Sequence, residues 1–470
     1  MVNTQSVKNI LKGSEDISFI DLYINKKIEK PVTLVYVQGL VNTAIINESL
    51  LKPLTQDSLL GTLDEKAIID QIIHGALYHL SKEIKDSVEE VVTDVLTGNA
   101  VLIFDGEKKA IVFEVRGFDK RGISEPSDEN VIKGSKDSFI EVMRVNTALI
   151  RRRIVSSDLR IKEVVVGKNT KTTISIVYLN GVAKPTVISE VEKRINEIDI
   201  DSLKSAGSME EHIVDHKYSI FPQTIYTERP DKACSNILEG KIAIIIDGYP
   251  IVYIVPVVFN MLFQSGEDYS FNYIQSSVVR LLRYICAFIS LILPGFYISI
   301  VSFHQEMLPT SLMISIIKSK ESVPVSSFFE VILLLLAFEI LIEAGVRLPK
   351  TIGQAISIVG GLVIGDAAVN AKFVSPAVVV VLAVAAICGF IIPNQDLSNS
   401  FRILRGILVL ASSFLGLYGL AIAFILILYY LCTLTSFNMP FMRESYPNRK
   451  YMIFIDGLFR IPRKEKREGN

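Results

Sequence analysis

The chain has 470 residues, 50% of them hydrophobic and 21% charged, with a formal net charge of −1 at pH 7. A net charge so close to zero does not suit nucleic-acid binding. Four cysteines are too few for a disulfide scaffold. Charged residues are spread through the first 275 residues, whereas the last 195 contain long apolar runs. The composition therefore excludes an entirely soluble protein.

Residues 1–118 are expected to form a first α/β subdomain. The β-branched run Val32–Val37 is followed by a segment of helical length and then by a hairpin whose Asp105-Gly106 turn joins two apolar strands. The N-terminus lacks the basic start and apolar core of a secretory signal. We therefore expect this part of the chain on the cytoplasmic side of a membrane.

Two segments of this subdomain recur later in the chain at one spacing. "VYVQGLV" at 35–41 returns as "VYLNGVA" at 177–183, an offset of 142. "VLIFDG" at 101–106 returns as "AIIIDG" at 243–248, again an offset of 142. A constant offset between weak matches indicates a duplication.

The duplication predicts a second α/β subdomain at residues 157–275. Residues 157–260 should superpose on residues 15–118, and the Asp247-Gly248 turn should occupy the place of the Asp105-Gly106 turn.

Residues 119–156 are expected to connect the two subdomains. The connector begins as a loop rich in Pro, Ser and Asp and continues as an amphipathic helix that contains Arg151, Arg152 and Arg153. These arginines suit contact with anionic lipid or a partner, or they dock one subdomain on the other.

No catalytic or cofactor-binding set can be assembled from the first 275 residues. They contain no Gly-x4-Gly-Lys-Ser/Thr loop and no Gly-x-Gly-x2-Gly after a strand. His212 and His216 have the spacing of two metal ligands on a helix, but nothing provides a third ligand, and "EEHIVDH" is typical of a solvated helix face. We expect no enzymatic activity, no cofactor and no metal.

Residues 276–440 are expected to form an α-helical transmembrane domain with four spans, or five if residues 351–372 also cross. Basic residues before the first run, Arg280 and Arg283, and in the tail at 441–470 place both ends on the cytoplasmic side. The four runs of about 20 apolar residues that support this expectation are Tyr284–Phe303, Phe328–Val346, Val374–Pro393 and Gly406–Leu434.

The second run carries charged residues where water is expected to be absent. Glu339, Glu343 and Arg347 recur every four residues on one helix face, with Glu330 nearly opposite. In one interpretation Glu343 pairs with Arg347 and Glu330 reaches the membrane surface, which leaves only Glu339 deep in hydrocarbon. In the other, this face meets water or partner helices in an oligomer, where rings of carboxylates attract cations.

Residues 351–372 carry a second polar face. On one face of this segment, Val359 and Val363 would form a hydrophobic constriction. Asp366 and Asn370, which follow them, would form a polar vestibule, as in a pore wall. Gly361 and Gly365 have the spacing that lets another helix approach closely. A membrane-surface helix with Asp366 at the water boundary is the alternative. The candidate pore-lining residues of both segments are Glu339, Glu343, Val359, Val363, Asp366 and Asn370.

Five segments carry a family resemblance: "RGISEPSDENVIKGSKDSFIEVMRVNTALIRRRI", "DGYPIVYIVPVVFNMLFQSGEDYS", "LPGFYISIVSFHQEMLPTSL", "EAGVRLPKTIGQAISIVGGLVIGDAAVNAKFVSP" and "SFNMPFM". Together they resemble the GerA family of spore-germination proteins, in particular the A subunits of germinant receptors. The resemblance covers nearly the whole chain.

The resemblance implies a subunit of a complex in the spore inner membrane, with a transporter-like B subunit and a lipoprotein C subunit. It implies about five copies in contact with lipid, forming a ligand-gated channel that releases monovalent cations. Alternatives are an accessory channel like the SpoVAF group, and a membrane-anchored scaffold or signalling subunit whose partner binds the nutrient. A transporter is disfavoured because no repeat is visible in the membrane half.

Overall fold

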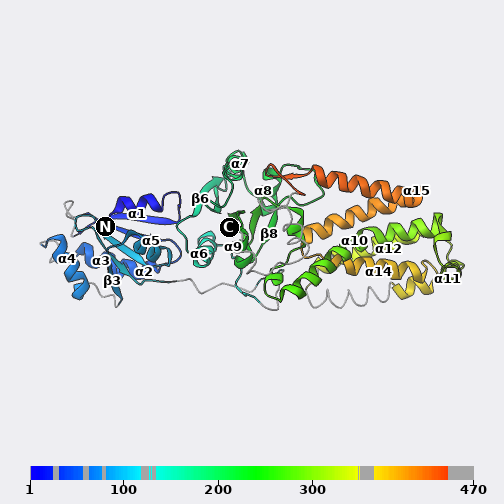
Figure 1. Ribbon diagram of the computed structural model, residues 1–470, viewed down its shortest axis with the longest axis horizontal. Helices are drawn as coiled ribbons and strands as arrows, with labels where there is room; N and C mark the ends of the chain where they lie inside the picture. The colour runs from blue at the N-terminus through cyan, green and yellow to red at the C-terminus, as the bar shows by residue number, and fades with distance from the viewer. Residues whose placement is uncertain are drawn as a thin grey trace. The chain divides into compact units, whose positions relative to one another are not determined.

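The computed structural model describes residues 2–24, 31–56, 63–76, 81–117, 126, 129, 134–347, 349 and 365–442. The chain divides into two compact units (Figure 1). We call them the sheet unit, Met1–Lys217, Gln223–Val257 and Ser436–Asn438, and the helical unit, Tyr218–Pro222, Val258–Thr435 and Met439–Asn470.

The first part of the sheet unit is an antiparallel sheet with the strand order β1-β2-β4-β5-β3. Its central strands are apolar on both faces because helices cover both faces. Leu34 and Leu102 pack toward the helices that follow β2, and Val35 and Val101 pack toward α1 and α5. The elements are α1 (Thr4–Ile10), β1 (Ile17–Tyr23), β2 (Pro31–Val37), α2 (Thr43–Ile45), η2 (Ile46–Leu51), α3 (Lys52–Gln56), α4 (Glu65–Gln71), η4 (Ile72–Ala76), β3 (Lys82–Lys85), α5 (Val88–Leu96), β4 (Ala100–Phe104) and β5 (Lys109–Phe113).

The second part repeats this arrangement in a sheet with the order β6-β7-β9-β10-β8. Each strand takes the position of its counterpart in the first sheet. The elements are α6 (Met143–Arg153), β6 (Leu159–Val166), β7 (Thr172–Leu179), α7 (Pro185–Asn196), α8 (Ala206–Ile213), β8 (Ile225–Thr227), α9 (Pro230–Leu238), β9 (Ile242–Ile246) and β10 (Val252–Val255).

The two sheets agree in register at an offset of 142 residues. Thr33 pairs with Ile103 in the first sheet, and Ser175 pairs with Ile245 in the second. The same offset relates every strand pairing of the two sheets that the structure describes. One pair of helices follows it too, since α5 and α9 begin at Val88 and Pro230. The predicted duplication is confirmed.

The Asp-Gly turns occupy equivalent places, as predicted, and each receives the start of a helix. Asp105 Oδ1 accepts a hydrogen bond from the backbone N–H of Thr4 at 2.7 Å, and Asp247 Oδ1 accepts one from Met143 at 3.1 Å. A carboxylate at a helix N-terminus satisfies an otherwise unpaired N–H. The helix expected in the connector, α6, is thus the counterpart of α1 and part of the second repeat.

A buried ion pair joins the two repeats. Arg151 Nε and Nη2 donate to the carboxylate of Asp16 at 2.8 and 2.9 Å, and both side chains are 1% exposed. The nearby Arg153 pairs with Asp137 at 2.6 Å. Of the two roles considered for this arginine cluster, Arg151 therefore serves the docking of one repeat on the other.

The helical unit consists mainly of long helices. Besides the short turns η5 (Phe259–Phe263), η6 (Gly266–Tyr269) and η7 (Gln305–Met307), its described elements are α10 (Tyr273–Phe303), α11 (Thr310–Lys320), α12 (Ser327–Arg347), α14 (Pro376–Phe390) and α15 (Gln395–Thr433). A two-stranded hairpin, β11 (Thr435–Ser436) and β12 (Met439–Pro440), follows α15. Residues 443–470 of the predicted basic tail lie outside the described residues.

The apolar run predicted as the fourth span, residues 406–434, is not one straight helix. Gly416 has φ 58° and ψ −142°, values at which the helix is interrupted. The ring of Phe221 lies 6.5 Å from Phe401 and 6.1 Å from Tyr430, whereas a straight helix would hold those two residues about 43 Å apart. The chain therefore reverses at Gly416, and α15 is two antiparallel legs (Figure 1).

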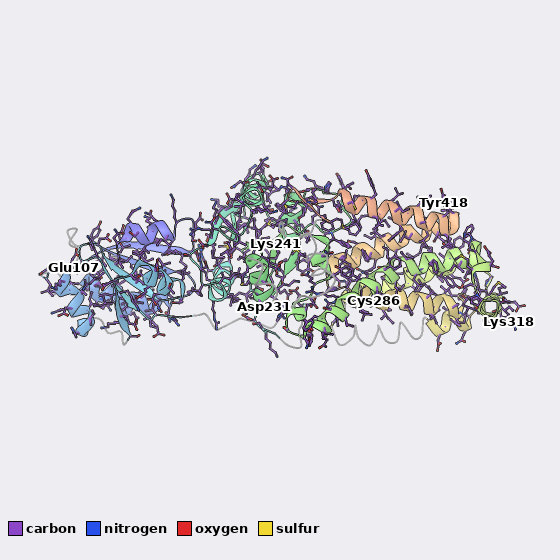
Figure 2. All side chains as sticks on the ribbon, in the orientation of Figure 1. Glu107, Asp231, Lys241, Cys286, Lys318 and Tyr418 are labelled. Atoms are coloured by element: carbon purple, nitrogen blue, oxygen red, sulfur yellow. The ribbon has the colours of Figure 1, made fainter. Side chains whose placement is uncertain are left out.

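The predicted count of four spans is not confirmed. In the part of the chain that the structure describes, α10 and α15 are long and apolar enough to cross a membrane. The second predicted run lies in α12, which carries three glutamates, and the third lies in α14, whose 15 residues are fewer than the roughly 20 that a span needs. Figure 2 labels Tyr418 on the returning leg of α15, where its side chain is exposed.

Candidate functional site

Glu339 of α12 forms a bidentate ion pair with Arg402 of α15. Its Oε1 accepts a hydrogen bond from Arg402 Nε at 3.0 Å, and its Oε2 accepts one from Arg402 Nη2. The carboxylate side chain is 44% exposed and the guanidinium side chain 24%. The charge of Glu339 is thus balanced within the same chain, which lowers the free-energy cost of placing it on this largely apolar helix.

The other two glutamates of α12 differ in their surroundings. Glu343 pairs with Arg347, whose Nε lies 2.7 Å from Glu343 Oε1, so the predicted i, i+4 pair is confirmed. The expectation that Glu330 reaches outward is wrong, because its side chain is fully buried. Its Oε2 accepts the N–H of Ser375 at 2.7 Å, and its Oε1 lies 3.2 Å from Lys320 Nζ. These partners inside the helical unit replace water.

Residues 365–370 are helical and have two different sides. Ala368 and Val369 pack against the apolar core formed by α10, α12 and α14, whereas Asp366 and Asn370 are exposed. An added Cβ at Gly365 would meet only Val379, at 4.0 Å, so no backbone approaches closely there within the chain. The remaining predicted residues of this segment, Val359, Gly361 and Val363, lie outside the described residues.

A pocket lies beside the Glu339–Arg402 pair, between α12, α14 and α15. Its polar lining consists of Glu339, Ser398, Arg402, Arg405 and the backbone at Gly389. Its walls are otherwise apolar: Leu335, Phe338, Ile342, Leu382, Ala386 and Phe390. A few convergent polar groups in an apolar hollow are typical of a small-ligand site.

Arg405 is the most deeply buried charge of this pocket, at 5% exposed. Its Nε donates to the carbonyl oxygen of Ser290 at 2.7 Å, and its Nη2 donates to Ser290 Oγ and, at 3.4 Å, to the carbonyl oxygen of Ala385. An added Cβ at Gly389 would lie 3.3 Å from Arg405 Nη2, so a glycine there gives the guanidinium its room. In the described part of the chain, all partners of Arg405 are neutral atoms.

A second cluster of buried charges lies at the start of α10. Arg283 Nη1 donates to Asp268 at 2.8 and 2.9 Å and to the carbonyl oxygen of Phe263 at 3.0 Å, and Arg280 Nε donates to Asp268 at 2.9 Å. All three charged side chains are buried. The two arginines that supported the predicted orientation thus hold the turn η6 against α10.

His212 and His216, four residues apart in sequence, do not lie on one helix. α8 ends at Ile213, so His212 is helical and His216 is not. His212 Nδ1 lies 2.7 Å from the carbonyl oxygen of Ser208. Within the described ranges, no three His, Cys, Asp or Glu side chains gather into a metal site.

Sequence reasoning missed Arg402 and Arg405 as parts of the site. The two arginines stand three residues apart directly before the apolar run at 406–434, and this position was the available signal, because arginines at such places usually face a partner or a polar cavity.

Comparison with known proteins gives a match along nearly the entire chain. Residues 5–469 match the family model of the Bacillus/Clostridium GerA spore germination protein. Spore germination protein KA of Bacillus subtilis (strain 168) is 37% identical over 460 residues, which cover 98% of this chain and 84% of that protein. The uncharacterized membrane protein YfkQ of the same strain is 38% identical over 417 residues, 89% of this chain and 80% of that protein.

Among solved structures, one that the chain resembles has a TM-score of 0.42. It is the crystal structure of the N-terminal domain of the A subunit of the Bacillus megaterium spore germinant receptor GerK3, 29% identical, covering 55% of this chain and 94% of that one. The family match and the identities of the relatives settle the assignment: the chain belongs to the GerA family of spore germination proteins, of the germinant-receptor A-subunit type.

Proposed function

We propose that this chain is the A subunit of a nutrient germinant receptor in the spore inner membrane, where copies of it form a ligand-gated channel for monovalent cations. Support comes from the family match and from relatives named as spore germination proteins. A transporter-like B subunit and a lipoprotein C subunit complete the receptor. A ring of about five copies surrounds the path, because one chain of this size is too small to enclose it.

In this proposal the helical unit crosses the membrane several times, with both chain ends on the cytoplasmic side, which is the spore core. The exposed side chains of α15 include Phe414, Leu415, Ile425 and Leu426, and such an apolar surface suits lipid rather than water.

The observation that carries the channel proposal is the two-sided helix at residues 365–370. Its apolar side is held in the core, and its polar side, with Asp366 and Asn370, faces away from it. Repeated around a ring, this side gives a path lined by carboxylates and amides, which favours cations. Glu339 is less available for that role because Arg402 balances its charge. Val359 and Val363, which precede this side in sequence, are proposed as the narrow part of the path.

Measurements of ion release from spores test the proposal. We expect Asp366→Asn to slow nutrient-triggered release of potassium, and Val363→Ala to cause release without nutrient, because the first removes charge from the path and the second widens it. Glu321→Gln, which neutralises an exposed carboxylate at the end of α11, is the matched control and should behave as wild type. Normal release from both test variants, at normal protein levels, would remove this segment from the path.

A second candidate function is a membrane-anchored subunit that transmits a signal while its partner binds the nutrient. The internal neutralisation of Glu339 and Glu343 favours it, because paired carboxylates are poor cation attractors. An accessory channel of the SpoVAF type is the other alternative. The conductance of the purified complex in planar bilayers separates the candidates. A cation current that Asp366→Asn abolishes supports a channel. An assembled complex that carries no current supports the signalling subunit.

A further inference from the structure

We propose that the pocket between α12, α14 and α15 binds a phosphate group, and that its source is the headgroup of an anionic phospholipid. This inference rests on the membrane placement of the helical unit and does not depend on channel activity. Neither the family assignment nor the relatives assign a ligand to this pocket.

The charge of the pocket is unbalanced. Arg402 and Arg405 lie three residues apart on the first leg of α15, and both line the pocket. Glu339 is the one carboxylate among the described lining residues, and it pairs with Arg402. Arg405 contacts only neutral atoms in the described part of the chain. A guanidinium this deeply buried is costly without an anion, so an external anion would be stabilised here.

Arg405 also has hydrogen-bonding capacity left over. A guanidinium has five N–H donors, and the contacts of Arg405 use those of Nε and Nη2. The Nη1 group makes no hydrogen bond to any described residue. Arg402 lies in the same lining and adds a second guanidinium, so the pocket offers a tetrahedral oxyanion two positive charges and at least one unused donor group, whereas the hydroxyl of Ser398 already donates to the carbonyl oxygen of Gly389 at 3.0 Å. Glu339 lies at the same site and would compete with the ligand for Arg402.

The surface around the pocket favours a lipid over a free ion. Phe390 lines the pocket and is 64% exposed, and Leu336 and Ile340 of α12, beside the lining residues, are also exposed. Acyl chains can cover such a surface, whereas inorganic phosphate gains nothing from it. A basic pocket that opens between helices onto an apolar surface is the arrangement in which anionic headgroups bind membrane proteins.

Native mass spectrometry of the full-length protein released from detergent micelles tests the proposal. The protein is titrated with phosphatidylglycerol, and separately with phosphatidylcholine of the same acyl chains. We expect selective retention of phosphatidylglycerol. In a second arm, inorganic phosphate at millimolar concentration competes with the lipid. No displacement supports the headgroup as the source, and displacement shows that the pocket takes a free oxyanion. Equal retention of the two lipids, with no effect of phosphate, overturns the proposal.

Three variants separate a binding role from a structural one. Arg402→Gln should weaken phosphatidylglycerol binding about tenfold, because one charge-assisted contact is lost. Glu339→Gln should strengthen it, because Arg402 loses its internal competitor, and a merely structural ion pair predicts no such gain. Arg347→Gln removes a matched arginine from an exposed pair with glutamate and should leave binding unchanged. Equal effects of Arg402→Gln and Arg347→Gln, or weaker binding by Glu339→Gln, contradict the assignment.

Discussion

The side chain of Lys241 is buried, as is that of its counterpart in the first repeat, but the residues that bond that counterpart are not repeated. Its counterpart in the first repeat, Asn99, donates to Asp94 at 3.1 Å and accepts from Arg116 at 3.2 Å. At the offset of 142, Asn236 and Val258 stand where Asp94 and Arg116 stand in the first repeat. Lys241 precedes β9 and is labelled in Figure 2. Burial lowers its pKa to about 8, although the Glu239 carboxylate opposes this shift.

This pKa predicts a pH dependence of stability with a definite sign. The unfolded chain keeps the Lys241 proton up to about pH 10.5, whereas the folded chain releases it above about pH 8. The unfolded state therefore binds more protons between these values, and the free energy of unfolding should rise with pH across this window. Lys241→Met should remove this rise and should stabilise the protein at pH 7 by about 3 kcal/mol.

Thermal unfolding of the full-length chain in detergent at pH 7.5 and pH 10 measures this effect. Lys193→Met, at an exposed lysine, is the control and should leave the difference between the two pH values unchanged. If Lys241→Met and wild type show the same pH dependence, the amine of Lys241 is not desolvated in the folded protein.

At the scale of elements, contacts close in sequence were predictable and distant ones were not. The repeated Asp-Gly turns revealed both sheets, because local turn chemistry and a constant offset are readable in one chain. The Glu343–Arg347 pair follows from helical spacing. Glu339 and Arg402, 63 residues apart, meet only through the packing of α12 on α15. No local pattern specifies that packing, so neither the pair nor the pocket beside it was predicted.

The reversal of α15 was missed for a related reason. A run of apolar residues predicts one span whether or not the chain reverses direction within it. Glycine is common in membrane helices, so its presence does not indicate a reversal either. The decisive feature is the backbone of Gly416, whose φ of 58° and ψ of −142° lie in a region open essentially only to glycine. There its missing side chain also leaves room for Phe303, whose Cβ would lie 3.0 Å from an added Cβ.

We therefore predict that Gly416→Ala destabilises the helical unit by about 1–3 kcal/mol, because alanine rarely adopts this conformation and would also crowd Phe303. Gly406→Ala, ten residues earlier in the same helix, is the matched control. An added Cβ there meets nothing within 4 Å, so alanine should be neutral or slightly stabilising. Melting of the two purified variants in detergent gives the comparison. Equal melting temperatures would show that the reversal does not depend on Gly416.

At the scale of the whole molecule, the chain returns to the sheet unit after α15. Ser436–Asn438, which comprises the end of β11 and the turn that leads to β12, belongs to that unit. Ser436 Oγ donates to the carbonyl oxygen of Gln223 at 2.8 Å and accepts the N–H of Val257 at 3.0 Å. Residues far apart in sequence thus complete one fold. The motif "SFNMPFM" contributed to the family resemblance, but its position could not be read from the sequence because nothing local indicates where a short segment docks.

Asp215 and Arg194 hold this turn in a conformation that is unfavourable by itself. Phe437 and Asn438 have positive φ values of 49° and 60°, which is rare for a bulky residue such as Phe. Asp215 accepts both of their backbone N–H groups, at 3.1 and 3.2 Å, and the Arg194 guanidinium lies 4.7 Å from the centre of the Phe437 ring. Since Phe437 is buried, its ring is an apolar anchor held by two charged residues of the second repeat.

These contacts predict that a fragment of residues 1–257 is incomplete and can be repaired in trans. A peptide of residues 434–441 should raise its melting temperature, because a ligand that binds only the folded state stabilises it, by about 2.7 kcal/mol at a concentration 100 times Kd. The same peptide with Phe437→Ala should have little effect, since it lacks the buried ring, and the fragment with Asp215→Asn should respond weakly to the wild-type peptide. Differential scanning fluorimetry of the fragment with each peptide measures these shifts. A fragment that melts at one temperature with and without the wild-type peptide would mean that the second repeat is stable without Phe437 and that the returning segment does not hold it together.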